Sequence, residues 1–256
     1  MKALIKALIK DSKIEPMARW LVYRSYGLRK PLDLVKDEIY DRQAFEVMSR
    51  VLSPESCCVD VGCHKGQFLA EYLRCAPKGT HFAFEPIPYL YDRLCENFSS
   101  VKIYDYALSD KQGETSFFVI PVNPAYSGLS PRKTIKKELA REEISVRTER
   151  LDAVIPPEIK IDFMKIDVEG AEGLVISGAL DTIRRNKPYI VLEHGESSSL
   201  MLGTKSDEIY DMLVTQCGLE ISLFPDWLSH KKPLTKQEFL SLRDCWYFLA
   251  HPEYIP

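Results

Sequence analysis

The sequence predicts an α/β fold in which parallel strands alternate with helices. From residue 57 onward, short β-rich runs alternate with helical stretches, which is the pattern of a parallel sheet covered by helices on both faces. Hydrophobic residues make up 45% of the 256-residue chain, which allows a substantial core. The sequence contains no internal repeat and no long linker, so we expect one main domain.

The predicted strands are short and apolar, and about seven are expected, at 57–62, 80–85, 101–107, 161–167, 188–194, 219–224 and 245–250. Between them, apolar residues recur at helical spacing, which predicts helices at 67–76, after Pro86, at about 171–185 and at about 206–217. Pro86 ends the second strand because proline has no backbone N–H for strand pairing.

Residues 113–150 interrupt this alternation. Two strand-like runs, TSFFVIP and ISVRTER, enclose a polar segment with several prolines. We expect a β-hairpin insertion whose connection is mobile. The residues before the first strand have helical character, so the predicted division is a helical N-terminal extension at 1–50 and the main domain at 51–256.

Charge and cysteine usage restrict the cellular setting. The 34 Lys and Arg residues and 37 Asp and Glu residues give a net charge of -3, so no overall basic field favours a nucleic-acid partner. Seven scattered cysteines without a CxxC pair indicate reduced thiols. No apolar run reaches about 18 residues and no signal peptide is recognisable, so we expect a cytoplasmic protein. The oligomeric state is not predicted.

The first 30 residues are basic. They contain eight Lys or Arg residues against two acidic residues, with Leu4, Ile5, Leu8 and Ile9 at helical spacing. A helix with this pattern can pack its apolar stripe on the domain or lie on an anionic membrane surface. Both interpretations stay open from the sequence.

The segment CVDVGCHKGQF carries the first chemical signal. An apolar strand ends in Asp60, Val61 and Gly62, and a tight turn leads into a helix after Gly66. Such a turn lets a ligand approach bare backbone at a helix start. His64 stands where a dinucleotide fingerprint has its second glycine, which disfavours a pyrophosphate. The turn suits better a ligand that has an amino-acid part and a nucleoside part, and Asp60 is then expected to bind the ammonium group of that ligand.

Glu85 strengthens this interpretation. It ends the second strand 23 residues after Gly62, where a carboxylate binds the ribose hydroxyls in nucleoside-binding α/β folds. A surface carboxylate that caps the following helix is the simpler alternative. Because Asp60 and Glu85 follow successive strands, we expect them at the same edge of the sheet.

Five segments stand in a characteristic order and spacing: VDVGCHKGQF, FEP at 84–86, ALSDKQG at 107–113, RTERLD at 147–152 and KIDVEGAE at 165–172. Together they resemble the FkbM-type methyltransferases. The resemblance implies a seven-stranded Rossmann-like methyltransferase sheet and the cofactor S-adenosyl-L-methionine. It also implies that the protein methylates a hydroxyl of a sugar, a glycan or a related metabolite.

The resemblance also implies a set of cofactor-binding residues. Asp60, Gly62 and Gly66 are expected around the methionine part, Glu85 at the ribose, and the turn at Tyr106, Ala107 and Leu108 at the adenine, while His64, Pro86 and Asp167 complete the set.

The predicted catalytic residues are Lys165, Asp167 and His194. Strand alternation places Lys165 and Asp167 on one face. Lys165 lies in an apolar strand and needs a carboxylate partner, so we expect an ion pair. His194 ends the fifth strand and is predicted to face the cleft and to take the proton of the acceptor hydroxyl, with Glu193 on the opposite face. Asp167 is the second candidate for the base.

The oxygen and imidazole groups of Asp167, Glu169 and His194 are ligands that suit a divalent ion. Their spacing matches no recognised ligand pattern, so no metal is predicted. Glu169 and Glu172 are expected to start the next helix, where carboxylates favour the positive end of the helix dipole.

Two other functions stay open. A nicotinamide-dependent oxidoreductase shares the acidic residue after the second strand but needs room for a pyrophosphate. A noncatalytic nucleoside-binding scaffold in glycan biosynthesis would keep Asp60 and Glu85 without methyl transfer. The predicted partner is a small-molecule or glycan acceptor, and no motif distinguishes methylation of oxygen, nitrogen or carboxyl groups.

Overall fold

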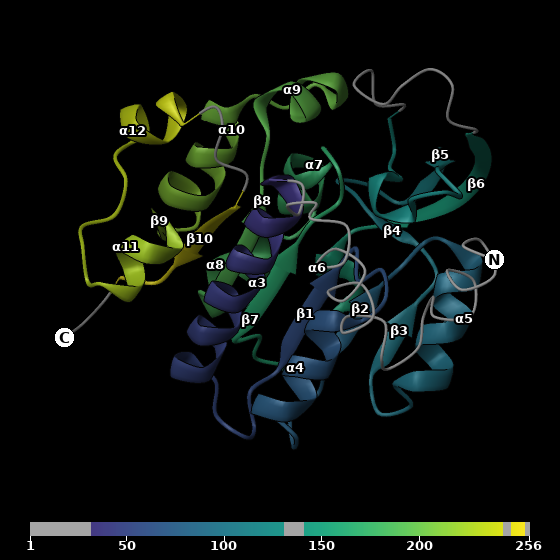
Figure 1. The fold of residues 1–256 in the computed structure, drawn as a ribbon, viewed down its shortest axis with the longest axis horizontal. Helices are drawn as coiled ribbons and strands as arrows, with labels where there is room; N and C mark the ends of the chain where they lie inside the picture. Colours follow the sequence, from purple (N-terminus) through teal and green to yellow (C-terminus); the bar gives the residue numbers. More distant parts are fainter. Residues whose placement is uncertain (1–31, 131–140, 243–246, 254–256) are drawn as a thin grey trace, which may run out of the picture. The chain divides into compact units, whose positions relative to one another are not determined.

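The computed structural model describes residues 32–130, 141–242 and 247–253. The chain divides into two compact units, Met1–Arg42 and Gln43–Pro256, and the division falls within helix α3 (Leu32–Val51) (Figure 1). The basic stretch at 1–30, with its two interpretations, lies outside the described residues. The predicted domain boundary after residue 50 stays a prediction.

The second unit contains a seven-stranded sheet in the order β3-β2-β1-β7-β8-β10-β9 (Figure 1). Neighbours from β3 to β8 are parallel, and β10 is antiparallel to both of its neighbours. This confirms the predicted α/β class and the seven strands. Their bounds are β1 Cys58–Val61, β2 Phe82–Phe84, β3 Lys102–Tyr104, β7 Phe163–Ile166, β8 Tyr189–Glu193, β9 Glu220–Ser222 and β10 Tyr247–His251.

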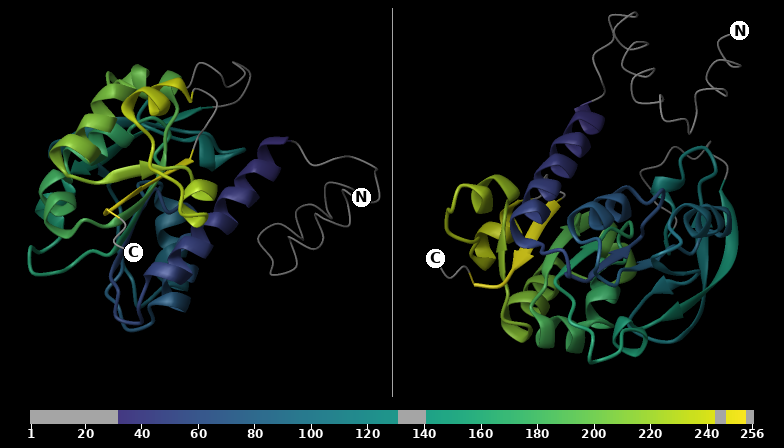
Figure 2. Two further views of the ribbon diagram at one scale, coloured as in Figure 1. Left: turned by 90° about the vertical axis from the view of Figure 1, so that its left-hand side faces the viewer. Right: turned by 90° about the horizontal axis from the view of Figure 1, so that it is seen from below.

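Helices cover both faces of this sheet. Helices α4 and α5 lie on one face, and α7, α8 and α10 lie on the other (Figures 1 and 2). The bounds are α4 Gln67–Cys75, α5 Pro88–Asn97, α6 Leu151–Val154, α7 Glu172–Ser177, α8 Leu180–Asn186, α9 Glu196–Ser199, α10 Ser206–Tyr210, α11 Phe224–Leu228 and α12 Lys236–Ser241, with 3-10 turns at Pro124–Tyr126 and Leu200–Leu202 and a π-helical turn at Asp211–Gln216.

Strand alternation separates two environments. One face of the strands presents fully buried aliphatic side chains to the main core with α7, α8 and α10, namely Val59, Val61, Met164, Ile166, Ile190 and Leu192. The residues between them point to the α4 face, where Asp60 and Lys165 lie side by side in the register of β1 and β7. The two buried charged residues of the central strands therefore share one face.

Two predicted helices differ from the structure. The helix expected at 171–185 is two helices, α7 and α8, which separate at Gly178 and Ala179. Ala179 leaves helical geometry with a φ of -121°, and the carbonyl oxygen of Gly178 accepts from the N–H of Asp152 at 3.0 Å, outside the helix. The helix expected at 206–217 begins as α10 and continues as a π-helical turn.

The predicted insertion is present as a second sheet. Strands β5 (Gly113–Val119) and β6 (Glu142–Glu149) form the expected antiparallel hairpin. A short strand β4 (Ala107–Leu108) adds to β6 in parallel, which gives the order β4-β6-β5. Ala107 and Leu108 are thus part of a strand and not of the predicted turn. The connection that was expected to be mobile falls largely at 131–140, outside the described residues.

The described residues include six of the seven cysteines, and none of the six forms a disulfide. Three are buried, two are half-buried and one, Cys95, is exposed. Across the described ranges, no helix combines the length and the hydropathy that crossing a bilayer requires.

The strand register builds one functional edge. Val61 stands beside Phe84 and Ile166, and Ile166 stands beside Leu192. Since these strands are parallel, the residues that follow them line one edge of the sheet. The row contains Gly62, Glu85, Asp167 and, at the end of β8, Glu193.

Gly62 holds the centre of this edge, and its replacement tests the arrangement. Its φ is +77°, and an added β-carbon would lie 2.1 Å from the carbonyl oxygen of Asp167. Gly203 has a similar φ of +83° with nothing within 4 Å of the added atom. We expect Gly203→Ala to lower the free energy of unfolding by about 1 kcal/mol and Gly62→Ala by about 3 kcal/mol or more. Urea unfolding of both variants measures the difference, and equal losses would contradict the close contact.

Candidate active site

The turn after β1 is fastened to the end of β2. The backbone N–H groups of Gly62 and Cys63 both donate to the carbonyl oxygen of Phe84, at 3.0 and 3.4 Å. The N–H of Gly66 then donates to Cys63 at 2.7 Å, and α4 begins at the next residue. The segment expected around the methionine part of a cofactor is therefore a tight turn between two strand ends.

Glu85 joins the turn to the segment after β2. Its side chain is 4% exposed. Oε2 accepts from the backbone N–H of His64 at 2.8 Å, and Oε1 accepts from that of Ile87 at 3.0 Å, across the half-buried Pro86. Burial raises the pKa of Glu85 to about 7, against the lowering effect of these two N–H donors. Each oxygen keeps a further lone pair, so the carboxylate can still accept hydroxyl donors.

Asp60 is a buried carboxyl group without a hydrogen-bond partner among the described residues. It is 1% exposed, and neither side-chain oxygen reaches solvent. Burial raises its pKa to about 6, the Lys165 ammonium acts in the opposite direction, and Asp167 adds to the rise. Buried polar groups are nearly always paired in native proteins, so an unpartnered carboxylate indicates a missing cationic or N–H partner.

Lys165 and Asp167 form the ion pair that the sequence predicts. Lys165 Nζ lies 2.8 Å from Asp167 Oδ2 and 5.2 Å from the centre of the Phe68 ring. Tyr247, at the start of β10, places its hydroxyl 3.5 Å from the same Oδ2 atom. Burial alone would lower the pKa of Lys165, but the carboxylates of Asp167 and Asp60 raise it above its usual value. Lys165 therefore stays charged and orients Asp167.

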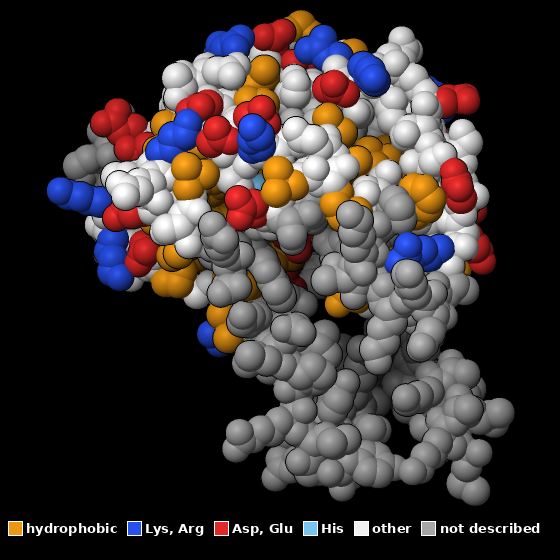
Figure 3. All heavy atoms as spheres, turned by 90° about the horizontal axis from the view of Figure 1, so that it is seen from above, with side chains coloured by type: hydrophobic (Ala, Val, Ile, Leu, Met, Phe, Trp, Pro, Cys, Tyr) orange, Lys and Arg blue, Asp and Glu red, His pale blue; other side chains and the backbone are white. Residues whose placement is uncertain are grey.

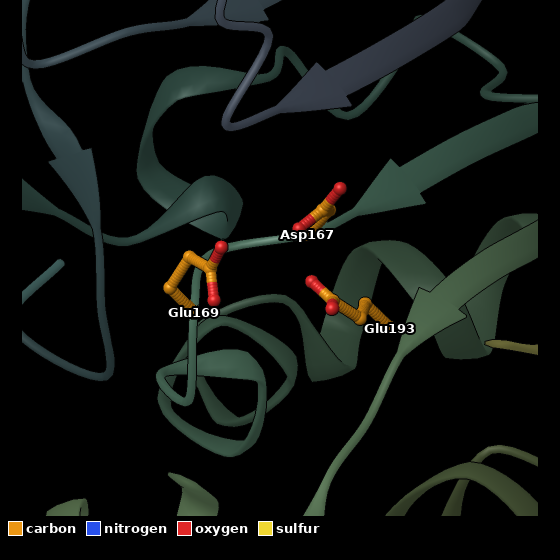
Figure 4. Close-up of side chains that lie close together, drawn as sticks. All are labelled: Asp167, Glu169 and Glu193. Carbon is orange, nitrogen blue, oxygen red and sulfur yellow. The ribbon is translucent and has the colours of Figure 1, made fainter. Parts of the chain in front are cut away.

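Three carboxylates meet at this edge: Asp167 after β7, Glu169 in the following loop and Glu193 at the end of β8. One oxygen from each lies within 4.8 Å of the others, and all three side chains are half-buried. Figure 4 shows them pointing toward one another. We refer to these three residues as the acidic group. Oxygen ligands of this type suit a hard divalent ion, but the same oxygens can accept hydroxyl protons, and the prediction of no metal stays a prediction.

The surface around this edge is mixed in charge. Figure 3, which looks down on it, shows acidic, basic and hydrophobic side chains interspersed over the described part of the surface.

His194 does not face the acidic group, so its predicted orientation is wrong. Its Nε2 lies 2.8 Å from the hydroxyl of Ser206, and its Nδ1 lies 3.1 Å from that of Ser199. The ring stacks on Phe239 and is 5% exposed. Glu193 takes the position expected for His194, because the register of β7 and β8 continues from the Ile166–Leu192 pair to Asp167 and Glu193.

The residues expected at the adenine are buried. Tyr106 packs among Phe84 and Tyr104, with ring centres 5.8 and 5.3 Å away, and Leu108 belongs to the same core. Ala107 belongs to a separate cluster with Ile87. The contact of these residues with a cofactor stays a prediction.

Sequence reasoning missed two residues of the edge, Glu193 and Tyr247. Alternation correctly placed Glu193 and His194 on opposite faces, but the face toward Asp167 was assigned to His194 when it belongs to Glu193. Pairing β7 with β8 would have decided it. Tyr247 carries no local signal, because β10 is antiparallel and reaches the edge with its first residue.

The fold and this edge define an α/β protein of the Rossmann-like class, with acidic side chains after its central strands. Residues 60–221, more than half of the chain, match the family described as the Methyltransferase FkbM domain. The chain belongs to this family and is a methyltransferase of the FkbM type.

Two relatives and one solved structure are similar to parts of the chain. The chain is 28% identical over 187 residues to the 2-O-methyltransferase NoeI of Sinorhizobium fredii. The aligned region covers 66% of this chain and 73% of NoeI. The chain is also 27% identical over 234 residues to the AMB antimetabolite synthetase AmbE of Pseudomonas aeruginosa. That alignment covers 77% of this chain and 11% of AmbE. A crystal structure of Methyltransferase FkbM from Methylobacillus flagellatus aligns with a TM-score of 0.49 at 15% identity, over 78% of this chain and 44% of that one.

The surroundings of His194 predict a pH effect on stability. Burial lowers its pKa from 6.5 to about 4. Between pH 6.5 and about 4, His194 binds a proton in the unfolded chain but not in the folded protein. Its contribution to the free energy of unfolding is therefore complete above pH 6.5 and is lost as the pH falls toward 4. This difference corresponds to about 3 kcal/mol at most.

Replacing His194 by Gln removes this titration. We expect the free energy of unfolding to fall less between pH 7 and pH 4.5 in His194→Gln than in the unmodified protein, as measured by urea unfolding. Other titrating groups are common to both proteins and cancel in the comparison. If the free energy of unfolding changed equally with pH in both proteins, His194 would not be buried in its neutral form.

Proposed function

We propose that the protein is an S-adenosyl-L-methionine-dependent O-methyltransferase that acts on a hydroxyl of a sugar, a glycan or a related small metabolite. Membership of the FkbM family supports methyl transfer, and similarity to a 2-O-methyltransferase supports oxygen as the nucleophile. The observation that carries the proposal is the single row formed by Gly62, Glu85, Asp167 and Glu193 at the carboxyl edge of the sheet.

The chain's own groups match the parts of this cofactor. The unpartnered oxygens of Asp60 would pair with its ammonium group, since a buried carboxylate needs a cation. Glu85 would accept from the two ribose hydroxyls with its remaining lone pairs. The tight turn at Gly62 and Cys63, fastened to Phe84, would present its backbone to the methionine part.

The bound cofactor would supply a methyl group on a positively charged sulfur. The protein contributes orientation, because holding donor and acceptor in line can be worth about 7 to 11 kcal/mol in ideal cases. In our proposal, Glu193 accepts the hydrogen bond of the acceptor hydroxyl and takes its proton as the oxygen–methyl bond forms and the sulfur–methyl bond breaks, while Asp167 and Glu169 accept from neighbouring hydroxyls of the acceptor. Glu193 is preferred to Asp167 because Asp167 Oδ2 already accepts from Lys165 Nζ. A general base typically adds about a hundredfold to ten-thousandfold.

Isothermal titration with S-adenosyl-L-methionine, S-adenosylhomocysteine and NAD tests the cofactor. We expect micromolar binding of the first two, weakened about tenfold or more in Asp60→Ala and in Glu85→Ala, because each variant removes an acceptor that a neutral methyl group cannot replace. Glu114→Ala, which changes an exposed carboxylate in the insertion, serves as the control. Binding of NAD alone would favour an oxidoreductase and overturn the proposal.

Transfer of a labelled methyl group to a panel of sugars and glycans tests the acceptor side. With a productive acceptor, we expect Glu193→Gln to lower kcat about a hundredfold, because the amide cannot take the proton. Glu196→Gln, an exposed neighbour, should keep kcat. Cofactor binding without transfer to any hydroxyl, amine or carboxyl acceptor would favour the noncatalytic scaffold, and a rate abolished by EDTA would assign the acidic group to a metal.

A further inference from the structure

The loop between β7 and α7 has a strained backbone. Glu169 has a φ of +60° and Gly170 a φ of +108°. A residue with a side chain rarely adopts a positive φ, so such a conformation persists where the surroundings hold it in place. This conformation brings the Glu169 carboxylate into the acidic group.

Glu172, the first residue of α7, holds this loop by hydrogen bonds. Its side chain is 1% exposed, and its Oε1 atom accepts two backbone N–H groups, from Val168 at 3.2 Å and from Gly170 at 2.9 Å. These two donors flank Glu169 in the chain. A single carboxylate oxygen therefore fixes the peptide group that follows Glu169 and the one that joins Asp167 to Val168. Glu172 is also the carboxylate that was expected at the helix start, and α7 does begin at Glu172.

Glu172 reaches the Asp167 segment through the N–H of Val168, whereas the N–H and the side chain of Asp167 itself are held by other residues. Its backbone N–H donates to Val61 at 3.2 Å, which continues the ladder of β1 and β7, and its side chain pairs with Lys165. The close contact between Gly62 and the Asp167 carbonyl belongs to the same strand pair. The cofactor side of the edge is thus fixed by the sheet.

Glu169 lies on the other side of the loop, against the insertion. A β-carbon added to Gly128 would lie 3.3 Å from the β-carbon of Glu169. Gly128 is paired with Phe118 of β5, so this contact is made by the insertion sheet. The position of Glu169 therefore depends on the loop that Glu172 fastens, and not on the strand ladder.

We propose that Glu172 is a positioning residue that places Glu169 for the methyl acceptor and leaves cofactor binding to the sheet. This inference rests on the proposed function, because it assigns Glu169 to the acceptor. It predicts that loss of the Glu172 side chain lowers kcat/KM for the acceptor and leaves the affinity for the cofactor nearly unchanged.

The test compares Glu172→Ala, Glu172→Gln and Glu169→Ala with the unmodified protein. Glutamine keeps an accepting oxygen for the two N–H groups and alanine does not. We expect Glu172→Ala and Glu169→Ala each to lower kcat/KM for the acceptor by about tenfold or more, with the Kd for S-adenosyl-L-methionine changed by less than about threefold. Glu172→Gln should stay within about threefold of the unmodified protein in both measurements.

A double variant distinguishes positioning from general damage. If Glu172 acts through Glu169, the double variant Glu169→Ala, Glu172→Ala loses no more kcat/KM than Glu169→Ala alone. Losses that multiply would overturn the proposal, as would equal effects of Glu172→Gln and Glu172→Ala. Should Glu172→Ala fail to fold, Glu172→Asp replaces it, because the shorter side chain keeps the charge but cannot reach both N–H groups.

The matched control is Glu238→Ala. Glu238 also lies in the first turn of a short helix, α12, and accepts a backbone N–H, from Thr235 at 2.8 Å, outside the matched family region. It should lower the melting temperature and keep kcat/KM. An unmodified protein that neither binds S-adenosyl-L-methionine nor transfers methyl groups would defeat the proposed function itself, which is a different outcome from any variant result.

Discussion

The charged centre of this protein depends on the buried ammonium group of Lys165. Parallel pairing of β1 and β7 places Asp60 beside Lys165, and Asp167 follows on the same face. Carboxylates in such a dry layer cost several kcal/mol each unless a cation or N–H donors compensate them. The ammonium 2.8 Å from Asp167 supplies that charge and rests on the ring of Phe68 in α4. One lysine thereby pairs with Asp167 directly and offsets part of the cost of burying Asp60, which keeps its oxygens for a further cation.

The edge is built by two kinds of structure with different stiffness. The turn at Gly62, the carboxylate of Glu85 and the backbone of Asp167 are held by strands and by hydrogen bonds between strand ends. Glu169 is held by a loop that one buried carboxylate fastens. Rigid strands suit an invariant cofactor, whereas loops on a rigid scaffold are where specificity for a substrate is usually built. The insertion sheet next to Glu169 agrees with this division.

Two adjacent residues, Glu193 and His194, show how position along a strand decides chemistry. Both stand at the carboxyl end of β8, yet the histidine packs against Phe239 with hydroxyls at both ring nitrogens, and the glutamate joins Asp167 and Glu169. A strand exposes successive side chains to opposite faces, so one residue serves the core and the next serves the edge. The polar character of a residue at a strand end is therefore not sufficient to assign it to a site.

The sequence by itself determined the α/β class, the seven strands, the hairpin insertion and the strand ends that carry Asp60, Glu85 and Asp167. These follow from local periodicity and motif spacing, which are properties of short segments. Tertiary structure alone decided that Glu193 and Tyr247 belong to the edge, that Glu172 holds the loop of Glu169, and that a predicted helix divides at Gly178. Each of these depends on which segments come together across the sheet, because register and facing are relations between strands that no single segment encodes.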